Sequence, residues 1–266
     1  MTGRHDFWHA FLSLGLILAS FQLYAAPKAE LWPFWQASNE SNHATIDHQP
    51  WQTILDRYLL VQGQHHLFDY QNVSASDKHA LKQYIRALAS LDPRDYRQAE
   101  QYAYWVNLYN ALTVDEILDH YPIRSITKLG GIFTFGPWDE DQVIVAGKTL
   151  TLNDIEHRIL RPIWQDPRTH YAVNCASLGC PNLQLNAFTS ANQEQLLDQA
   201  AKAFIRSPKG VLIQGNRAQL STIYQWFSDD FGGEKALFEH ISQYAPEYRG
   251  FTGKIRYDYD WSLNQP

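Results

Sequence analysis

The feature that most constrains the fold is a long apolar helix expected near the middle of the chain. It spans about residues 97–120 and contains the run Tyr-Trp-Val-Asn-Leu-Tyr-Asn-Ala-Leu at 104–112. A helix that is apolar around most of its circumference has to be covered by other elements, so we expect it at the centre of the molecule. Asn107 and Asn110 lie three positions apart and share one face. Because buried amides need partners, they either tie neighbouring loops to the helix or orient a catalytic group.

Shorter helices and paired strands flank this helix along the sequence. Apolar spacing and turn residues predict helices at 51–61, 76–91, 153–161, 190–206, 223–227 and 235–244, hairpins at 142–150 and 211–220, and single strands at 65–70, 132–135 and 255–261. Thr151 and Asp154 form a capping-box pattern before the 153–161 helix. The sequence therefore predicts an α+β class, with helices packed around a small, largely antiparallel sheet in one domain at 49–266. Residues 26–48 are expected to be a lead-in that docks by its aromatic side chains.

The N-terminal 25 residues have the features of a cleaved secretory signal. Arg4 supplies positive charge, residues 7–21 are mostly apolar, and the tripeptide at 23–25 ends in a small residue suited to cleavage. The run is short for a membrane span, and no later segment is long and apolar enough for one. We therefore expect a periplasmic or secreted protein with no integral span after cleavage, the alternative being an uncleaved anchor. The net charge of −6 argues against nucleic acid as a partner.

Both cysteines of the chain lie in one stretch, residues 170–181. The apolar run that His170 opens predicts a buried strand, and the small residues after Asn174 predict a loop that presents a thiol. Cys175 is therefore the candidate nucleophile, because a thiol near imidazole, amide and hydroxyl groups has the partners that covalent catalysis needs. Asn174, Ser177 and His170 are the candidates for substrate binding.

His157, on the helix expected at 153–161, is the candidate general base. Adjacent residues of a helix point apart, so Glu156 is not expected to orient its imidazole, and one of the two helix asparagines is the better orienting group. His170 competes for the role of base. Five positions along one strand would, however, put its side chain on the opposite side from Cys175, which favours His157.

The two cysteines also allow interpretations without nucleophilic catalysis. Cys175 and Cys180 are close enough in sequence for a structural disulfide, which an oxidising compartment would favour. The protein would then be a non-catalytic binding protein with a stiffened loop. A reversible bridge would instead make it a thiol redox module, although such modules usually have two residues between the cysteines. The spacing also departs from the usual zinc patterns, and no metal or cofactor is expected.

Four runs in the sequence resemble the DUF547 family, a domain of unknown function. They are residues 104–112, 154–161, 170–177 with the following Cys180-Pro181, and 257–264. The likeness extends from about Trp51 to Asn264 and implies a protein of the kind often exported by bacteria, with no cofactor and no settled activity. Because His157 precedes Cys175, a papain-like or transglutaminase-like site would have to be permuted.

We therefore expect a thiol-dependent hydrolase or acyl transferase. Cys175 is the nucleophile, His157 the base, and Asn107 or Asn110 helps to orient the imidazole or to bind the oxyanion with nearby backbone N–H groups. The substrate is a small molecule, peptide or glycan that the sequence does not specify.

Overall fold

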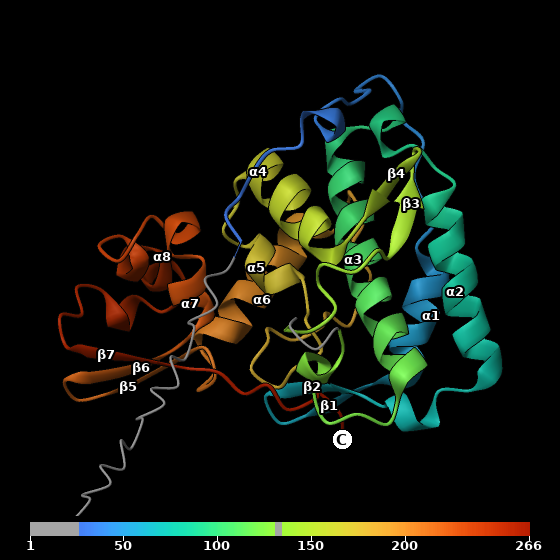
Figure 1. Cartoon of the computed structure of the whole chain (residues 1–266). Helices are drawn as coiled ribbons and strands as arrows, with labels where there is room; N and C mark the ends of the chain where they lie inside the picture. Colours follow the sequence, from blue (N-terminus) through green and yellow to red (C-terminus); the bar gives the residue numbers. More distant parts are fainter. Residues whose placement is uncertain (1–26, 131–134) are drawn as a thin grey trace, which may run out of the picture.

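The computed structural model describes residues 27–130 and 135–266 (Figure 1). The expected signal segment, and all but Phe135 of the strand expected at 132–135, lie outside these residues. Of the helices in the described ranges, none combines the length and the apolar character that a membrane crossing requires.

The predicted central helix is α3 (Gln98–His120), and it is surrounded on several sides. Helices α1 (Gln49–Tyr58) and α2 (Ala75–Ala89) lie to one side of it, and a helix made of the π-helical η5 (Asp154–Leu160) and α4 (Arg161–Trp164) lies to the other (Figure 1). Trp105 and Leu108 are completely buried, and Leu112 is 3% exposed. The prediction that an apolar helix would occupy the core is confirmed.

Two hairpins turn at glycines. The one at 143–150 is the predicted one, whereas the one at 59–68 takes its first strand from the end of the helix expected at 51–61, because that helix stops at Tyr58. Strands β1 (Leu59–Gln62) and β2 (His65–Phe68) pair antiparallel, as do β3 (Val143–Val145) and β4 (Lys148–Leu150). Gly63 and Gly147 adopt φ values of +60° and +73° in these turns, a region that glycine enters without steric cost.

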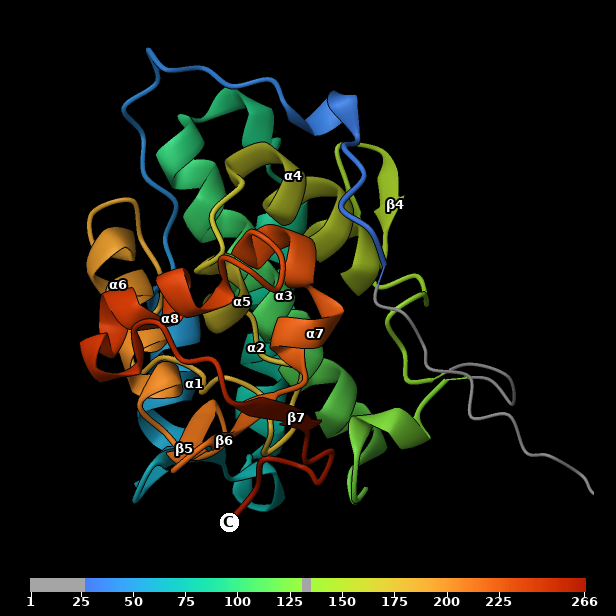
Figure 2. The same ribbon diagram turned by 90° about the vertical axis from the view of Figure 1, so that its left-hand side faces the viewer.

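A second hydrophobic cluster lies beside the α3 core. It consists of α6 (Gln193–Ile205), α7 (Ile223–Trp226), α8 (Leu237–Tyr244) and a sheet of β5 (Val211–Gln214), β6 (Arg217–Ser221) and β7 (Lys254–Asp258). Figures 1 and 2 both place α7, α8 and this sheet on one side of α3. β5 and β6 are antiparallel, whereas β7 runs parallel to β6. The α+β class is confirmed, with the described strands in three separate small sheets.

Short helical segments complete the described part: η1 (Pro33–Trp35), η2 (Tyr70–Asn72), η3 (Pro93–Asp95), η4 (Ile126–Lys128), α5 (Thr169–Ala172), η6 (Ser228–Phe231) and η7 (Pro246–Tyr248). In the lead-in, Trp35 is 1% exposed and packs edge-on against Trp105 with ring centroids 5.1 Å apart. The lead-in therefore docks by an aromatic side chain, as expected.

The strand predicted from His170 is wrong, because this segment forms the one-turn helix α5. The N–H groups of His170 and Tyr171 donate to carbonyls three residues earlier, and that of Val173 to one four residues earlier. Asp166 starts the turn by accepting a 2.8 Å hydrogen bond from the N–H of Arg168. A short buried apolar run is compatible with either structure, and the local turn decided this one.

Candidate active site

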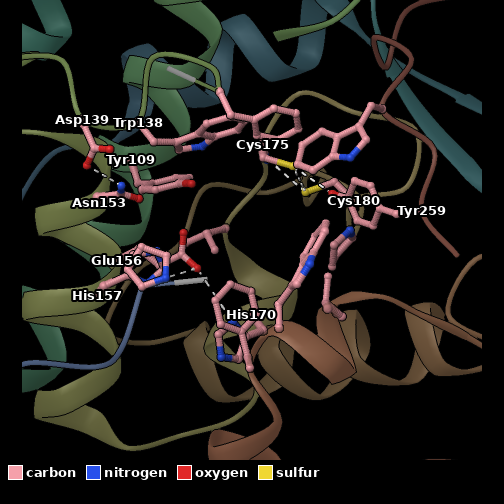
Figure 3. Close-up of a pocket in the computed structure, with 18 residues that line it drawn as sticks. Tyr109, Trp138, Asp139, Asn153, Glu156, His157, His170, Cys175, Cys180 and Tyr259 are labelled. Atoms are coloured by element: carbon pink, nitrogen blue, oxygen red, sulfur yellow. Dashed lines mark hydrogen bonds and ion pairs between the residues drawn. The ribbon is translucent and has the colours of Figure 1, made fainter. Parts of the chain in front are cut away.

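A cavity of about 210 Å³ lies where the π-helix, the cysteine loop and the segment after β7 meet (Figure 3). Cys175, His157 and His170 all line it. Glu156 and His157 lie on one side of the cavity, and Cys175 and Tyr259 on the other. The structure thus brings the predicted nucleophile and both candidate bases to one cavity.

The loop that carries Cys175 is held by buried amides. Asn110 accepts a 2.8 Å hydrogen bond from the N–H of Asn174 and donates one of 3.0 Å to the carbonyl of Ala172. Asn174 in turn accepts from the N–H of Ala176 at 2.9 Å and donates to the carbonyl of Pro181 at 2.7 Å. Ala176 has a φ of +57°, which costs an alanine about 1–2 kcal/mol. These bonds hold a strained backbone that directs Cys175 into the cavity.

The two helix asparagines therefore have the loop-tying role rather than the orienting one. Asn107 donates to the carbonyl of Phe188 at 2.7 Å and accepts from its N–H at 3.0 Å. Asn110 is used by the cysteine loop, and neither amide bonds to an imidazole within the described residues. Asn174 is likewise committed to its own loop, so its predicted contact with substrate is not supported by its position.

The sulfur of Cys175 has three polar neighbours. Cys180 Sγ lies 2.9 Å away, Tyr259 OH 3.0 Å and Ser177 Oγ 3.3 Å. Burial raises the pKa of the Cys175 thiol, but hydrogen bonds from Cys180, Ser177 and Tyr259 outweigh it and hold the pKa below its usual value. Ser177, a candidate for substrate binding, thus hydrogen-bonds to the Cys175 thiol, and only 1% of its own surface is exposed. The expected bond between His157 and this sulfur is not found among the described contacts.

Cys175 and Cys180 are both free thiols. Their 2.9 Å separation exceeds the ~2.05 Å of a disulfide bond, so the structural bridge considered from the sequence is absent here. Burial raises the pKa of the Cys180 thiol, and its neighbour Cys175 raises it further. The pair therefore consists of an acidic thiol facing the cavity and a buried one that keeps its proton.

Lys209 supports the loop from behind Cys180. Its Nζ donates to the carbonyl of Cys180 at 2.6 Å and to Oδ1 of Asn182 at 2.7 Å. Burial lowers its pKa to about 8, although the nearby sulfurs act in the opposite direction.

His157 is a poor base in this setting. Arg161 Nη1 lies 2.9 Å from its Nδ1, and a guanidinium can only donate, so Nδ1 accepts and the neutral ring carries its proton on Nε2. Burial lowers the pKa of His157 to about 4; Glu156 partly offsets this, and Arg161 adds to it. His157 therefore presents a hydrogen-bond donor to its surroundings.

His170 has the opposite arrangement. Its Nε2 lies 2.7 Å from Asp230 Oδ2, so Nε2–H donates to the carboxylate and Nδ1 is left as an acceptor. Asp230 also accepts from Arg161 Nε at 2.6 Å. Burial raises the pKa of Asp230, but the bonds from His170 and Arg161 outweigh it and hold the pKa well below its usual range. The sequence favours His157 as base because a strand would put His170 on the opposite side from Cys175. That reason no longer holds, since His170 lies in a helical turn and lines the same cavity as Cys175.

Glu156 faces the same space, contrary to the expectation that it would point away. Its Oε1 lies 3.9 Å from His157 Nδ1 and 3.8 Å from His170 Nδ1. The cause is the π-helical turn, whose wider coil changes the direction of neighbouring side chains and is frequent at functional sites. The capping-box pattern at its start is confirmed, because Thr151 N donates to Asp154 Oδ2 at 3.1 Å and Asp154 N to Thr151 Oγ1 at 3.0 Å.

Sequence reasoning missed Asp230, Arg161 and Tyr259 as parts of this site. The only signal for Tyr259 was its place in the terminal run that resembles the family, and nothing in the sequence pointed to Asp230. Within residues 27–130 and 135–266, no three side chains suited to metal ligation converge.

Residues 93–205 match the family model described as protein of unknown function, DUF547. The chain carries a DUF547 segment. This confirms the predicted resemblance over the part that runs from just before α3 to the end of α6. The segment includes Glu156, both candidate histidines and both cysteines, but it excludes Asp230 and Tyr259. No curated protein and no solved structure matches the chain, so a permuted papain-like or transglutaminase-like fold is not confirmed.

Proposed function

We propose that the DUF547 segment and its surroundings form a thiol-dependent hydrolase or acyl transferase with Cys175 as nucleophile. The observation that carries this proposal is that Cys175, with its lowered pKa, lines the same cavity as Glu156, His157 and His170. The thiolate is the reactive form of cysteine, and the imidazoles offer a proton donor and a proton acceptor.

In the proposed reaction, the Cys175 sulfur attacks a carbonyl carbon and forms a C–S bond. His157 Nε2–H stabilises the negative charge on the former carbonyl oxygen. His170, oriented by Asp230, holds the proton lost by the thiol on Nδ1 and returns it to the amine or alcohol as the C–N or C–O bond breaks. Water or another acceptor then gives its proton to His170 and displaces the sulfur. His170 therefore replaces His157 as the proposed base.

Acyl-enzyme trapping tests this proposal. The protein is incubated with a panel of aryl esters and thioesters, quenched in acid, and analysed by intact mass and peptide mapping. We expect an acyl adduct on Cys175 that disappears in Cys175→Ser and persists in the matched variant Cys180→Ser. His170→Gln should slow deacylation. A panel that leaves Cys175 unmodified, or an adduct formed equally well by the unfolded chain, would contradict the proposal.

The 2.9 Å contact between the two sulfurs favours a second candidate, thiol–disulfide exchange. The Cys175 thiolate would attack a substrate disulfide and release one thiol, and Cys180 would then resolve the mixed disulfide, leaving a Cys175–Cys180 bridge and a second thiol. Equilibration in glutathione buffers measures whether that bridge forms reversibly. Cys180→Ser separates the two candidates, because it should abolish turnover by exchange but still allow acylation of Cys175.

We also propose that the protein acts after export, in the periplasm or outside the cell. This rests on the first 25 residues alone. Mass spectrometry of exported material should find a chain that begins at Ala26, and an intact Met1 would contradict it.

A further inference from the structure

The charge of the cavity wall restricts what can bind beside Cys175. Among the described lining residues, the carboxylates are Asp139 and Glu156, and neither lysine nor arginine is present. Arg161 and Lys209 do not line the cavity. Arg161 is engaged with Asp230 at 2.6 Å, and Lys209 donates to backbone carbonyls. The described wall is therefore acidic.

Glu156 has no lysine or arginine partner among the described residues, and the Tyr109 hydroxyl lies near its carboxylate. Glu156 is 7% exposed, and its ion-pair contacts in the described part of the chain are imidazole nitrogens at 3.8 and 3.9 Å, beyond hydrogen-bond distance. One of these rings, His157, is held neutral by a pKa of about 4. A buried carboxylate is costly unless a positive charge compensates it, and a ligand can supply that charge.

The rest of the wall is rich in half-buried aromatic rings. The Trp261 ring centroid lies 4.5 Å from that of Tyr259, 5.5 Å from that of Trp226 and 5.8 Å from that of Trp138, so these rings form one continuous surface. The Tyr259 hydroxyl also lies 3.0 Å from the Cys175 sulfur. Aromatic faces attract cations, and this surface extends to the nucleophile.

We infer that the cavity accepts acyl substrates that carry a positively charged amine near the reactive carbonyl. The ammonium group lies between Glu156 and the tryptophan surface, and the carbonyl lies at Cys175. The volume of about 210 Å³ is below the ~300–1,000 Å³ of pockets for drug-sized ligands, so the enclosed group is small, of aminoacyl size. This inference rests on the proposed function, because it takes Cys175 as the nucleophile.

Three matched chloroacetamides test the inference. Their amide nitrogens carry a 2-(trimethylammonio)ethyl group, its neutral isostere 3,3-dimethylbutyl, or an anionic 2-carboxyethyl group. In each case the Cys175 thiolate displaces chloride, and the second-order rate constant is measured by intact mass and divided by that for N-acetylcysteine amide. We expect the cationic probe to react about tenfold or more faster than the neutral isostere, and the anionic probe to react slowest.

Since any thiolate attracts a cation, variants identify the source of the preference. Glu156→Gln should reduce the ratio of cationic to neutral rates several-fold, whereas Glu247→Gln, an exposed acidic residue in η7, makes the same change of charge outside the cavity and should leave it unchanged. Trp226→Leu provides a second variant with Glu156 intact and should also lower the ratio. Binding of unreactive acetylcholine to Cys175→Ser, followed by tryptophan fluorescence, measures recognition without the thiolate.

The outcomes separate the inference from the proposal on which it rests. Reaction of Cys175 with all three probes at equal normalised rates, or preference for the anionic probe, would overturn the inference and leave the nucleophile in place. Failure of every probe to label Cys175 would overturn both. A cationic preference that survives Glu156→Gln and Trp226→Leu unchanged would also overturn the inference, because it would arise from the thiolate alone.

Discussion

His48 should make the stability of the α3 core strongly dependent on pH. It is 4% exposed, its Nδ1 lies 2.7 Å from Tyr84 OH, and its Nε2 has no hydrogen-bond partner within the described residues. Burial lowers the pKa of His48 from 6.5 to about 4, although Glu100 and Asp47 partly offset the effect. Protonation would place a positive charge in the core on a ring whose Nε2 has no partner among the described residues, so the folded protein resists it.

Proton linkage gives the sign and the size of the change in the free energy of unfolding with pH. Between about pH 6.5 and pH 4 the unfolded state binds more protons at His48 than the folded state does, so stability is complete above pH 6.5 and falls as the pH is lowered towards 4. At pH 5 the contribution of this residue makes the free energy of unfolding about 2 kcal/mol lower than at pH 7.5. For a urea m-value of about 3 kcal/mol/M, the midpoint moves by roughly 0.7 M.

The assay is urea unfolding at pH 7.5 and pH 5, followed by emission from the buried tryptophans of this core. His48→Gln cannot titrate, so its free energy of unfolding should fall by about 2 kcal/mol less than that of the wild type between the two pH values. His43→Gln makes the same substitution at an exposed position five residues earlier and is the matched control. Equal pH-dependent losses in His48→Gln and the wild type would refute the reasoning, whatever the absolute stability of the variant.

Two other buried histidines should also lower the stability of the fold as the pH falls. Burial lowers the pKa values of His157 and His240 to about 4. Together the three histidines would cost about 6 kcal/mol at pH 5, which is comparable with the ~5–15 kcal/mol total of a typical domain. Burial raises the pKa values of Asp115 and Glu116, and these two carboxyls oppose the loss as the pH falls.

Two further substitutions test the cysteine loop. Tyr259→Phe removes a hydrogen bond to the Cys175 thiolate worth about 1.5–3 kcal/mol, so the pKa of Cys175 should rise and its thiolate fraction at pH 7 should fall. A more basic thiolate is also more nucleophilic, which offsets part of this effect, so the rate of iodoacetamide alkylation at pH 7 should fall roughly five- to fifteenfold. An unchanged rate would contradict this role of Tyr259. Asn110→Ala leaves the N–H of Asn174 and the carbonyl of Ala172 unpaired, so the free energy of unfolding should fall by about 2–4 kcal/mol in urea titrations, and a loss below about 1 kcal/mol would argue against the tie.

The sequence by itself determined the elements whose signals are local. Helix α3, the β3–β4 hairpin with its turn at Gly147 and the Thr151–Asp154 cap depend on apolar periodicity, on backbone freedom or on side chains within one turn, and all are as predicted. The sequence also placed a nucleophile candidate in a loop after a buried segment, and the DUF547 match covers that loop.

Tertiary structure alone decided the chemistry around the thiol. The partners of Cys175 and His170, Tyr259 and Asp230, lie 84 and 60 positions away in the chain, so no local pattern links them. The roles of the two histidines depend on which ring nitrogen already has a partner, and that is fixed by packing between distant segments. The apolar run after His170 is a helical turn rather than a strand because burial specifies only that a side chain is inside, while backbone hydrogen bonds specify the conformation.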